Sequence, residues 1–404
     1  MASLETKGKS PFYPDQPVPA DLFVGRAEQI QRIMERGVGQ VKLGKPVAMF
    51  VEGEYGIGKS SIADFVQRWS AQDHGLHGIY VSLGGCKSMD DVAYAVLKAT
   101  TLSGALNPTR AEAIKNWFAK YIGKQSLFGI TLNLETIKSD APGLAGHMGM
   151  LNFLNEVNRK LNESANTKGV FLVLDEINGI ADNPQFAHFI KGFWDTNAIN
   201  RPSLPLLLML CGVEERRREL IRNHEPVARI FDVVEITPMT EDEMRNFFVK
   251  AFQSVQISIE ESAMEFLIRF SAGFPKIMHL IGNAAFWIDK DGVISEIDAA
   301  DAVLAAADEV GKKYVDQQVY KAIRSGDYHS ILAKIARLDP HSMSFIKSEV
   351  SDLTESEKRK FNNFLQRMQK LNVIGKGEIK GEYVFKLRIV RLYLQLQSYR
   401  KTTK

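Results

Sequence analysis

Short apolar runs, each bounded by glycine or polar residues, recur along the first 240 residues. Val170–Leu174 consists of apolar residues only. Such runs are typical of strands that are buried on both faces of a parallel sheet. We predict five of them, with helical segments such as 26–38 and 59–69 between them, at residues 46–51, 79–83, 170–174, 204–210 and 233–236. This alternation predicts an α/β domain with helices on both faces of a parallel sheet.

After Pro238 the spacing of apolar residues becomes that of helices. We expect a separate helical domain at 238–327, with helices at 240–251, 260–270 and 275–288 and a longer one from Glu296.

The last 77 residues follow a third pattern. Helices are expected at 328–338, 345–350 and 355–371, and short strands at 373–374 and 383–387. Three helices followed by a glycine-tipped hairpin are typical of a winged helix-turn-helix domain, which we place at 328–404.

Two segments of the first domain, 1–237, do not fit the alternation of strands and helices. Residues 1–20 are polar and rich in proline, and we expect an extended arm. An insertion lies near 101–148, where 127–137 alternates weakly, as a hairpin does. No role follows from its sequence.

Composition excludes several classes of protein. With 45% hydrophobic and 25% charged residues, the 404-residue chain is neither disordered throughout, nor collagen-like, nor a disulfide scaffold. Its two cysteines, Cys86 and Cys211, suit a reducing compartment. Because we find neither a membrane-spanning run nor a secretion signal, we expect a cytoplasmic protein that does not bind membranes.

Charge is distributed unevenly. Residues 358–404 contain thirteen Lys or Arg and two acids, a net charge of +11, whereas the rest of the chain carries −8. A basic end on an acidic body raises the hypothesis of nucleic-acid binding, although a charge run is often only a solvated face.

The strongest motif follows the first predicted strand. Residues 53–60 read GEYGIGKS and satisfy the phosphate-loop pattern between a strand and a helix. Glycines let backbone N–H groups surround a polyphosphate, Lys59 meets the β and γ phosphates, and Ser60 coordinates Mg²⁺. The alternative is a glycine-rich loop that only turns. The predicted nucleotide-binding set is Gly53, Glu54, Tyr55, Gly56, Ile57, Gly58, Lys59, Ser60 and Ser61.

Two adjacent acids, Asp175 and Glu176, follow the third predicted strand. Asp175 is placed to hold Mg²⁺ through water, and Glu176 to polarise the water that attacks the γ-phosphate. Either acid could instead cap the following helix.

These motifs resemble those of the AAA+ superfamily, in the branch that contains replication initiators, transposition-regulator ATPases and STAND signalling ATPases. Residues 53–60 match its Walker A loop, 172–176 its Walker B strand, and 23–26 its adenine-side box, which adds Val24 to the nucleotide-binding set. The resemblance covers most of the chain and implies ATP and Mg²⁺ as cofactors, ATPase activity and a homo-oligomer.

Three further positions follow from the resemblance. The strand that carries a polar sensor in the family ends here in Cys211, and a thiol is a poor hydrogen-bond donor, which argues against fast hydrolysis. Arg229 lies where an arginine finger is expected. It could instead pair with Asp232 or Glu235, and the alternative fingers are Arg216, Arg217, Arg218 and Arg222. Lys276, after a GxP turn, is either a nucleotide contact or a solvated lysine.

In the C-terminal domain, basic and amide residues recur on the third helix, opposite its apolar face. A recognition helix presents such groups to phosphates and base edges. The predicted DNA contacts are Arg359, Asn363, Arg367 and Lys370 on the helix, and Lys376 and Lys380 on the wing.

The sequence therefore predicts an ATP-binding and ATP-hydrolysing switch that assembles on duplex DNA. The alternative is a STAND-type signalling ATPase whose winged helix, or whose insertion, binds a protein partner.

Overall fold

The computed structural model describes residues 7–14, 24–103, 144–338, 342–371, 373–377, 379–386 and 388–402. The chain forms two compact units. One comprises Pro17–Thr237, and the other joins Met1–Gln16 to Pro238–Lys404. The chain therefore begins in the second of these units, passes through the first, and returns.

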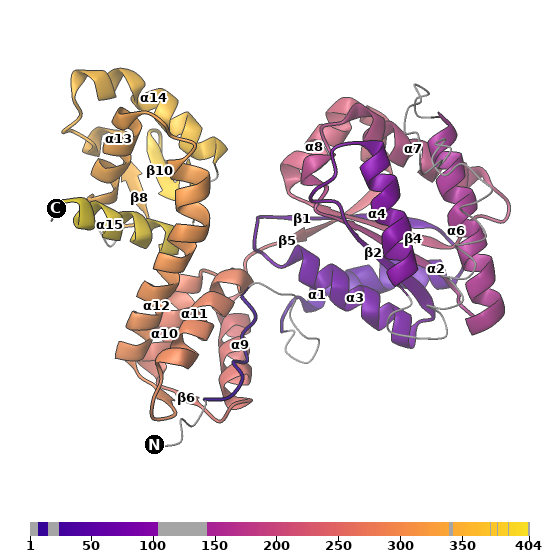
Figure 1. The fold of residues 1–404 in the computed structure, drawn as a ribbon, viewed down its shortest axis with the longest axis horizontal. Coiled ribbons are helices and arrows are strands. Elements are labelled where there is room, and N and C mark those ends of the chain that lie inside the picture. The colour runs from indigo at the N-terminus through magenta and orange to yellow at the C-terminus, as the bar shows by residue number, and fades with distance from the viewer. Residues whose placement is uncertain are drawn as a thin grey trace, which may run out of the picture. The chain divides into compact units, whose positions relative to one another are not determined.

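A five-stranded sheet forms the centre of the unit Pro17–Thr237 (Figure 1). All neighbouring strands are parallel, in the order β2-β3-β4-β1-β5. Each predicted apolar run forms one strand: β1 (Val47–Gly53), β2 (Leu76–Ser82), β3 (Gly169–Asp175), β4 (Leu206–Gly212) and β5 (Phe231–Ile236).

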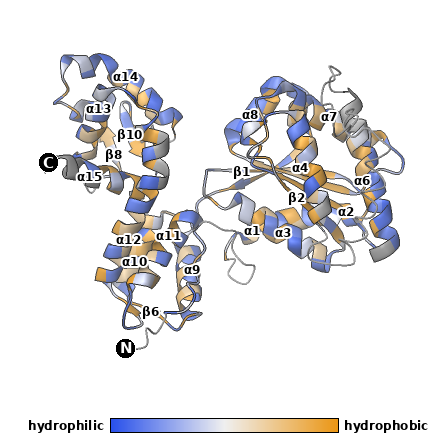
Figure 2. Ribbon diagram, in the orientation of Figure 1, coloured by the Kyte–Doolittle hydropathy of each residue, from blue (hydrophilic) through white to orange (hydrophobic). Residues whose placement is uncertain are grey.

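Helices cover both faces of this sheet, and the strands are coloured as hydrophobic between them (Figure 2). Along β4, Leu206, Leu208 and Leu210 belong to an apolar core on one face of the sheet. That core is completed by α4 (Met89–Leu102), α6 (Leu144–Ala165), α7 (Pro184–Ile199) and α8 (Glu214–Asn223). Leu207 meets Gly37 on the opposite face, which is covered by α1 (Ala27–Ile33), the π-helix η2 (Met34–Val38), α2 (Gly39–Lys42) and α3 (Lys59–Asp73).

Short 3-10 helices follow β3 and α8, at Ile177–Gly179 (η3) and Glu225–Arg229 (η4). The expected insertion begins within α4 and ends within α6. Residues 104–143, with the expected hairpin at 127–137, lie outside the described part of the chain.

The helices predicted after Pro238 are present. They are α9 (Glu241–Gln253), α10 (Glu261–Ser271), α11 (Pro275–Ile288) and α12 (Glu296–Val310), which continues as the π-helix η5 (Gly311–Tyr320). Capping boxes fix where two of them begin, because Thr240 and Glu243, and likewise Ser295 and Asp298, satisfy each other's backbone N–H groups. Two-residue strands, β6 (Ser258–Ile259) and β7 (Val293–Ile294), pair between the helices.

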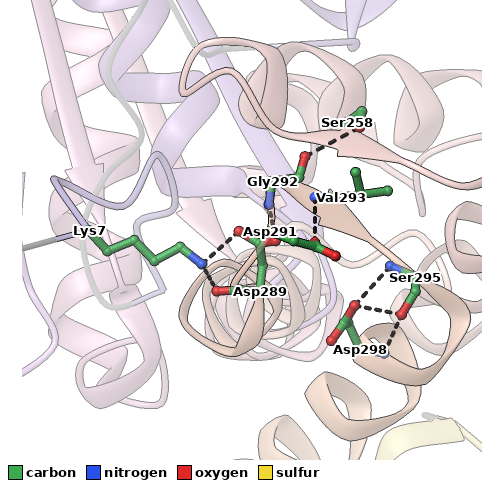
Figure 3. Close-up of polar contacts among 8 residues, drawn as sticks. All are labelled: Lys7, Ser258, Asp289, Asp291, Gly292, Val293, Ser295 and Asp298. Atoms are coloured by element: carbon green, nitrogen blue, oxygen red, sulfur yellow. Dashed lines mark hydrogen bonds and ion pairs between the residues drawn. The ribbon is translucent and has the colours of Figure 1, made fainter. Parts of the chain in front are cut away.

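The N-terminal arm, expected as part of the first domain, packs instead against these helices. Lys7 Nζ donates to the carbonyl oxygen of Asp289 and, at 2.7 Å, to its carboxylate (Figure 3). The same carboxylate accepts the N–H of Gly292, in the turn that leads into β7. Ser10 donates to Asn283 of α11 at 2.8 Å.

Phe12 explains why the arm docks there. Its side chain is 4% exposed and makes edge contacts with the rings of Phe252, Phe247 and His279. Gly282 provides the space, because a Cβ at this position would lie 2.2 Å from the Phe12 ring. Burial of an aromatic ring therefore holds a segment that has no regular secondary structure.

The C-terminal segment contains α13 (Gly326–Ala336), β8 (Ser344–Ile346), the 3-10 helix η6 (Lys347–Glu349), α14 (Glu355–Lys370), β9 (Ile374–Lys376), β10 (Glu382–Phe385) and α15 (Arg388–Thr402). The strands form an antiparallel sheet in the order β8-β10-β9, next to α13 and α14, as in a winged helix. The helix predicted at 345–350 is wrong. Phe345 pairs with Tyr383 on β10, and this pairing outweighs the helical spacing of the local sequence.

The helices of 238–327 and the segment 328–404, expected as separate domains, belong to the same compact unit. The final helix α15 connects them, because it packs against α13 and also against α12. Tyr393 lies against Gly311, where a Cβ would be 2.1 Å from its ring, and donates to Asp316 at 2.9 Å.

Candidate functional site

The loop between β1 and α3 has the backbone geometry of a phosphate cradle. Gly58, with φ of 100°, immediately precedes the first helical residue, so the N–H groups at the start of α3 point out of the helix. At Gly53, a Cβ would lie 2.5 Å from the carbonyl oxygen of Ile236 on β5. Within the loop Ile57 is buried, whereas Tyr55 is 57% exposed.

Lys59 is folded back over this loop. Its ammonium group donates to the carbonyl oxygens of Gly53 at 3.0 Å and Glu54 at 2.8 Å. Burial lowers its pKa, while the nearby Cys211 sulfur and the carboxylates, Asp175 among them, raise it. Lys59 thus begins α3 close to carboxylates, and a phosphate would be a stronger partner for it than the two carbonyls.

The two predicted acids lie at the same edge of the sheet as the loop. The register aligns Leu174 with Leu210 on β4 and Val51 with Cys211, so Asp175 and Gly53 both lie at the carboxyl ends of buried strands. Asp175 is 4% exposed. Glu176 is exposed and has left-handed backbone angles, φ 56° and ψ 48°, which are uncommon for a residue with a side chain.

Strand β2 supplies a hydroxyl group to each acid. Tyr80 donates to Oδ2 of Asp175 at 2.5 Å, and Ser82 donates to Oε2 of Glu176 at 3.2 Å. Our sequence analysis missed both residues. The available signal was the alternation of Tyr80 and Ser82 with apolar residues, in a strand that would otherwise be apolar on both faces.

The oxygen donors at this edge fit magnesium. Ser60 is the second residue of α3 and Asp175 the last of β3, and hydroxyl and carboxylate oxygens are ligands that Mg²⁺ prefers. Within the described residues, no group of three or more His, Cys, Asp or Glu side chains could hold a metal ion. A magnesium ion at this edge would therefore take its remaining ligands from phosphate and water.

Cys211, which the family resemblance aligns with the polar sensor, lies on β4 between β3 and β1. It is fully buried, and burial raises the pKa of its thiol well above the usual value. The thiol therefore stays protonated and can offer only a weak hydrogen bond to a phosphate.

Arg26 connects the adenine-side box to the phosphate loop. The residue is 5% exposed, and its guanidinium group donates to the carbonyl oxygens of Ile57, at 3.0 Å, and Thr237. It therefore holds the segment that contains Val24 against the loop, while Phe23 lies outside the described residues.

Arg229, at the end of η4, is exposed. Within the described residues it forms no ion pair, and Asp232, its suggested partner, pairs instead with Arg32 and Arg36. Three of the alternative arginines form ion pairs: Arg216 with Glu219, Arg217 with Glu52 and Arg218 with Glu214. Arg222, the fourth alternative, forms no ion pair within the described residues.

Lys276 lies at the second position of α11, after Gly273 with φ of 79° and Pro275 at the first helical position. Because Lys276 belongs to the other compact unit, its contact with nucleotide stays a prediction.

The predicted DNA-contact residues are all exposed. Along α14, Arg359, Asn363, Arg367 and Lys370 lie opposite Phe361, Phe364 and Met368, which are buried. Lys376 and Lys380 are exposed on the hairpin. None of these cations forms an ion pair within the described residues, whereas the adjacent Lys358 pairs with Glu355.

Part of the C-terminal charge is not on the surface. Arg391 is 2% exposed, with its guanidinium group 5.0 Å from the centre of the Phe385 ring. The net charge of +11 counted over residues 358–404 therefore overstates the positive charge on the surface of this segment.

Part of the chain resembles a known protein family. Residues 22–221 match the model of the AAA ATPase domain family. The search of curated proteins gave no significant match. Within the described residues, no helix has the length and apolar character of a membrane span.

Several solved structures share the fold over nearly the whole length of the chain. A Walker-type ATPase of Pyrococcus abyssi aligns with a TM-score of 0.59 at 16% identity, over 92% of this chain and 96% of that one. The Orc2 protein of Aeropyrum pernix in its ADP form gives 0.53 at 11%, over 96% and 97%. The Orc1 protein of the same organism, in complex with DNA, gives 0.50 at 15%, over 99% and 98%. The chain has the α/β fold of P-loop ATPases, and its residues 22–221 match the AAA ATPase domain family.

Proposed function

We propose that this protein binds ATP with Mg²⁺, hydrolyses it, and uses the nucleotide as a switch that controls its assembly on duplex DNA. One observation carries the nucleotide part. The phosphate loop with Lys59 and the acidic pair Asp175 and Glu176 follow buried parallel strands at one edge of the sheet. In parallel sheets, ligands bind outside the carboxyl ends of the strands.

Each residue has a role in the proposed reaction. Lys59 exchanges its two carbonyl partners for phosphate oxygens, which carry more charge. Ser60 and Asp175 would hold a magnesium ion, which would neutralise charge that develops on the phosphates. Glu176 accepts a proton from the attacking water, since it is the exposed carboxylate of the pair.

Turnover should be slow. Cys211 gives the γ-phosphate little hydrogen bonding, and Glu176 already accepts a hydrogen bond from Ser82. A slow ATPase suits a switch, because the bound nucleotide then defines a long-lived state.

The nucleotide part is tested by titration of a fluorescent ATP analogue. Loss of one charge-assisted contact of about 1.5–3 kcal/mol predicts that Lys59→Ala weakens binding roughly ten- to hundredfold. Glu176→Gln should bind as the parent does but fail to hydrolyse. Lys45→Ala is the matched control, because it removes an exposed lysine before the amino end of β1. Equal affinities for Lys59→Ala and the parent would refute the assignment.

The DNA part is supported by the exposed basic face of α14 and by the wing lysines, which form no ion pair within the described residues. The Orc1 protein with a similar fold was solved in complex with DNA. We propose that α14 faces a groove of duplex DNA and that Lys376 and Lys380 contact the backbone.

Fluorescence anisotropy with a DNA duplex at several salt concentrations tests this part. Each phosphate contact contributes about −0.9 to the slope of log affinity against log salt, so changing Lys376 and Lys380 to Ala should make the slope shallower by about two units. The control changes the exposed Lys250 and Lys290 of the same unit to Ala, which alters net charge equally. No binding at low salt, with or without ATP, would favour the alternative, a signalling ATPase whose winged helix binds a protein.

We further propose that the protein acts as a homo-oligomer in which Arg229 contacts the nucleotide of a neighbouring subunit. Its exposure, and the engagement of Arg216, Arg217 and Arg218 by acids of their own unit, support this choice.

A further inference from the structure

Tyr80 connects the two side chains that we assign to magnesium. Its hydroxyl donates a hydrogen bond to Oδ2 of Asp175 at 2.5 Å, and the Ser60 hydroxyl interacts with the same phenol group. Tyr80 therefore contacts both the end of β3 and the first turn of α3.

The position of Tyr80 follows from the alternation of side chains along β2. Ile79 and Val81 belong to the same apolar core as Leu206, whereas Gly78 and Tyr80 point to the opposite face of the sheet. There α3 covers the strand so closely that a Cβ at Gly78 would overlap Gln67 of that helix. Because α3 begins at Lys59 and Ser60, the Tyr80 ring reaches the start of the helix that follows the phosphate loop.

The hydrogen bond fixes the Asp175 carboxylate without using up its capacity to bind. Oδ1 accepts the backbone N–H of Glu176 at 2.8 Å, and Oδ2 accepts the Tyr80 hydroxyl. Each carboxylate oxygen can accept two hydrogen bonds, so both keep an acceptor site for a water molecule bound to a metal ion.

We propose that Tyr80 is a positioning residue for magnesium: it orients the Asp175 carboxylate and couples it to Ser60, so that the two are aligned before the nucleotide arrives. The inference rests on the proposed ATP-binding function. Residues that orient a metal ligand typically change metal affinity by about ten- to hundredfold when they are removed.

The test is Tyr80→Phe, which keeps the ring and removes only the hydroxyl. Affinity for a fluorescent ATP analogue is measured in EDTA and then along a magnesium titration. We expect the affinity in EDTA to be unchanged. The magnesium concentration at which half of the magnesium-dependent increase in affinity is reached should rise about tenfold. Binding, rather than turnover, is the readout.

The matched control is Tyr393→Phe, which removes a second hydrogen bond from tyrosine to aspartate, at 2.9 Å, in the unit that lacks the phosphate loop. It should leave the magnesium titration unchanged. Circular dichroism of both variants shows that each is folded.

Two outcomes would overturn the proposal. An unchanged magnesium midpoint in Tyr80→Phe would show that the hydroxyl does not position Asp175. An equal loss of affinity with and without magnesium would show that Tyr80 shapes the pocket instead. Failure of the parent protein to bind the analogue would refute the proposed function itself, and is distinguishable from both.

Discussion

Replacing Gly282 by Ala tests whether the N-terminal arm docks on α11. In an exposed helix, Gly→Ala is worth about 1 kcal/mol of added stability. Here the new Cβ would lie 2.2, 2.5 and 2.6 Å from three atoms of the Phe12 ring, well inside van der Waals contact. The ring cannot retreat, because Phe252 and Phe247 pack against it. The arm must therefore leave its site.

The magnitude follows from the loss of Phe12 packing. Removing a buried phenylalanine costs about 3 kcal/mol or more, so we expect that loss for Phe12→Ala. Gly282→Ala should lose the same contacts and regain about 1 kcal/mol of helix propensity, a net loss of about 2 kcal/mol. The double variant should also lose only about 2 kcal/mol, because no clash remains once the ring is gone.

Hydrogen exchange of peptides from α9 and α11 under increasing urea measures these differences within one unit. Gly326→Ala is the control, because a Cβ there would meet nothing within 4 Å. If Gly282→Ala stabilises α11 when Phe12 is present, the arm does not occupy this site and the reasoning fails.

Two further predictions concern the oligomer and the response to pH. Arg229→Ala should abolish turnover and spare nucleotide binding, and parent turnover should rise faster than linearly with protein concentration; turnover per subunit that is independent of concentration would exclude a finger in trans. Burial lowers the pKa of His279 to about 4, below an unfolded value near 6.5. The contribution of neutral His279 to the free energy of unfolding is thus complete above about pH 6.5. It is lost as the pH falls towards 4, which lowers the free energy of unfolding by about 3 kcal/mol. The urea midpoint of His279→Gln should not show this decline.

Local patterns in the sequence were sufficient for the sheet and the phosphate loop. The buried run at 170–174 and the spacing of Gly53, Gly58 and Lys59 are short-range features, and the register of a parallel sheet then brings Asp175 to the same edge. Similar reasoning located the exposed face of α14, because helical periodicity alone separates Arg367 from Phe364.

Features that depend on distant residues could not be predicted. Phe12 docks because Gly282, 270 positions later, leaves room for its ring. Ser344–Ile346 becomes a strand because β10 offers it a free edge. Tyr80 has no motif of its own, and its hydroxyl acquires a role only once β2 and β3 lie in register.

The docked arm also fixes an order of events during synthesis. Lys7, Ser10 and Phe12 are synthesised well before their partners, which lie on α9, on α11 and at Asp289 just after α11. At 5–20 residues per second, the delay is on the order of tens of seconds. In that interval all of Pro17–Thr237 is synthesised, so the phosphate-loop unit can fold before the arm meets the helices on which it docks.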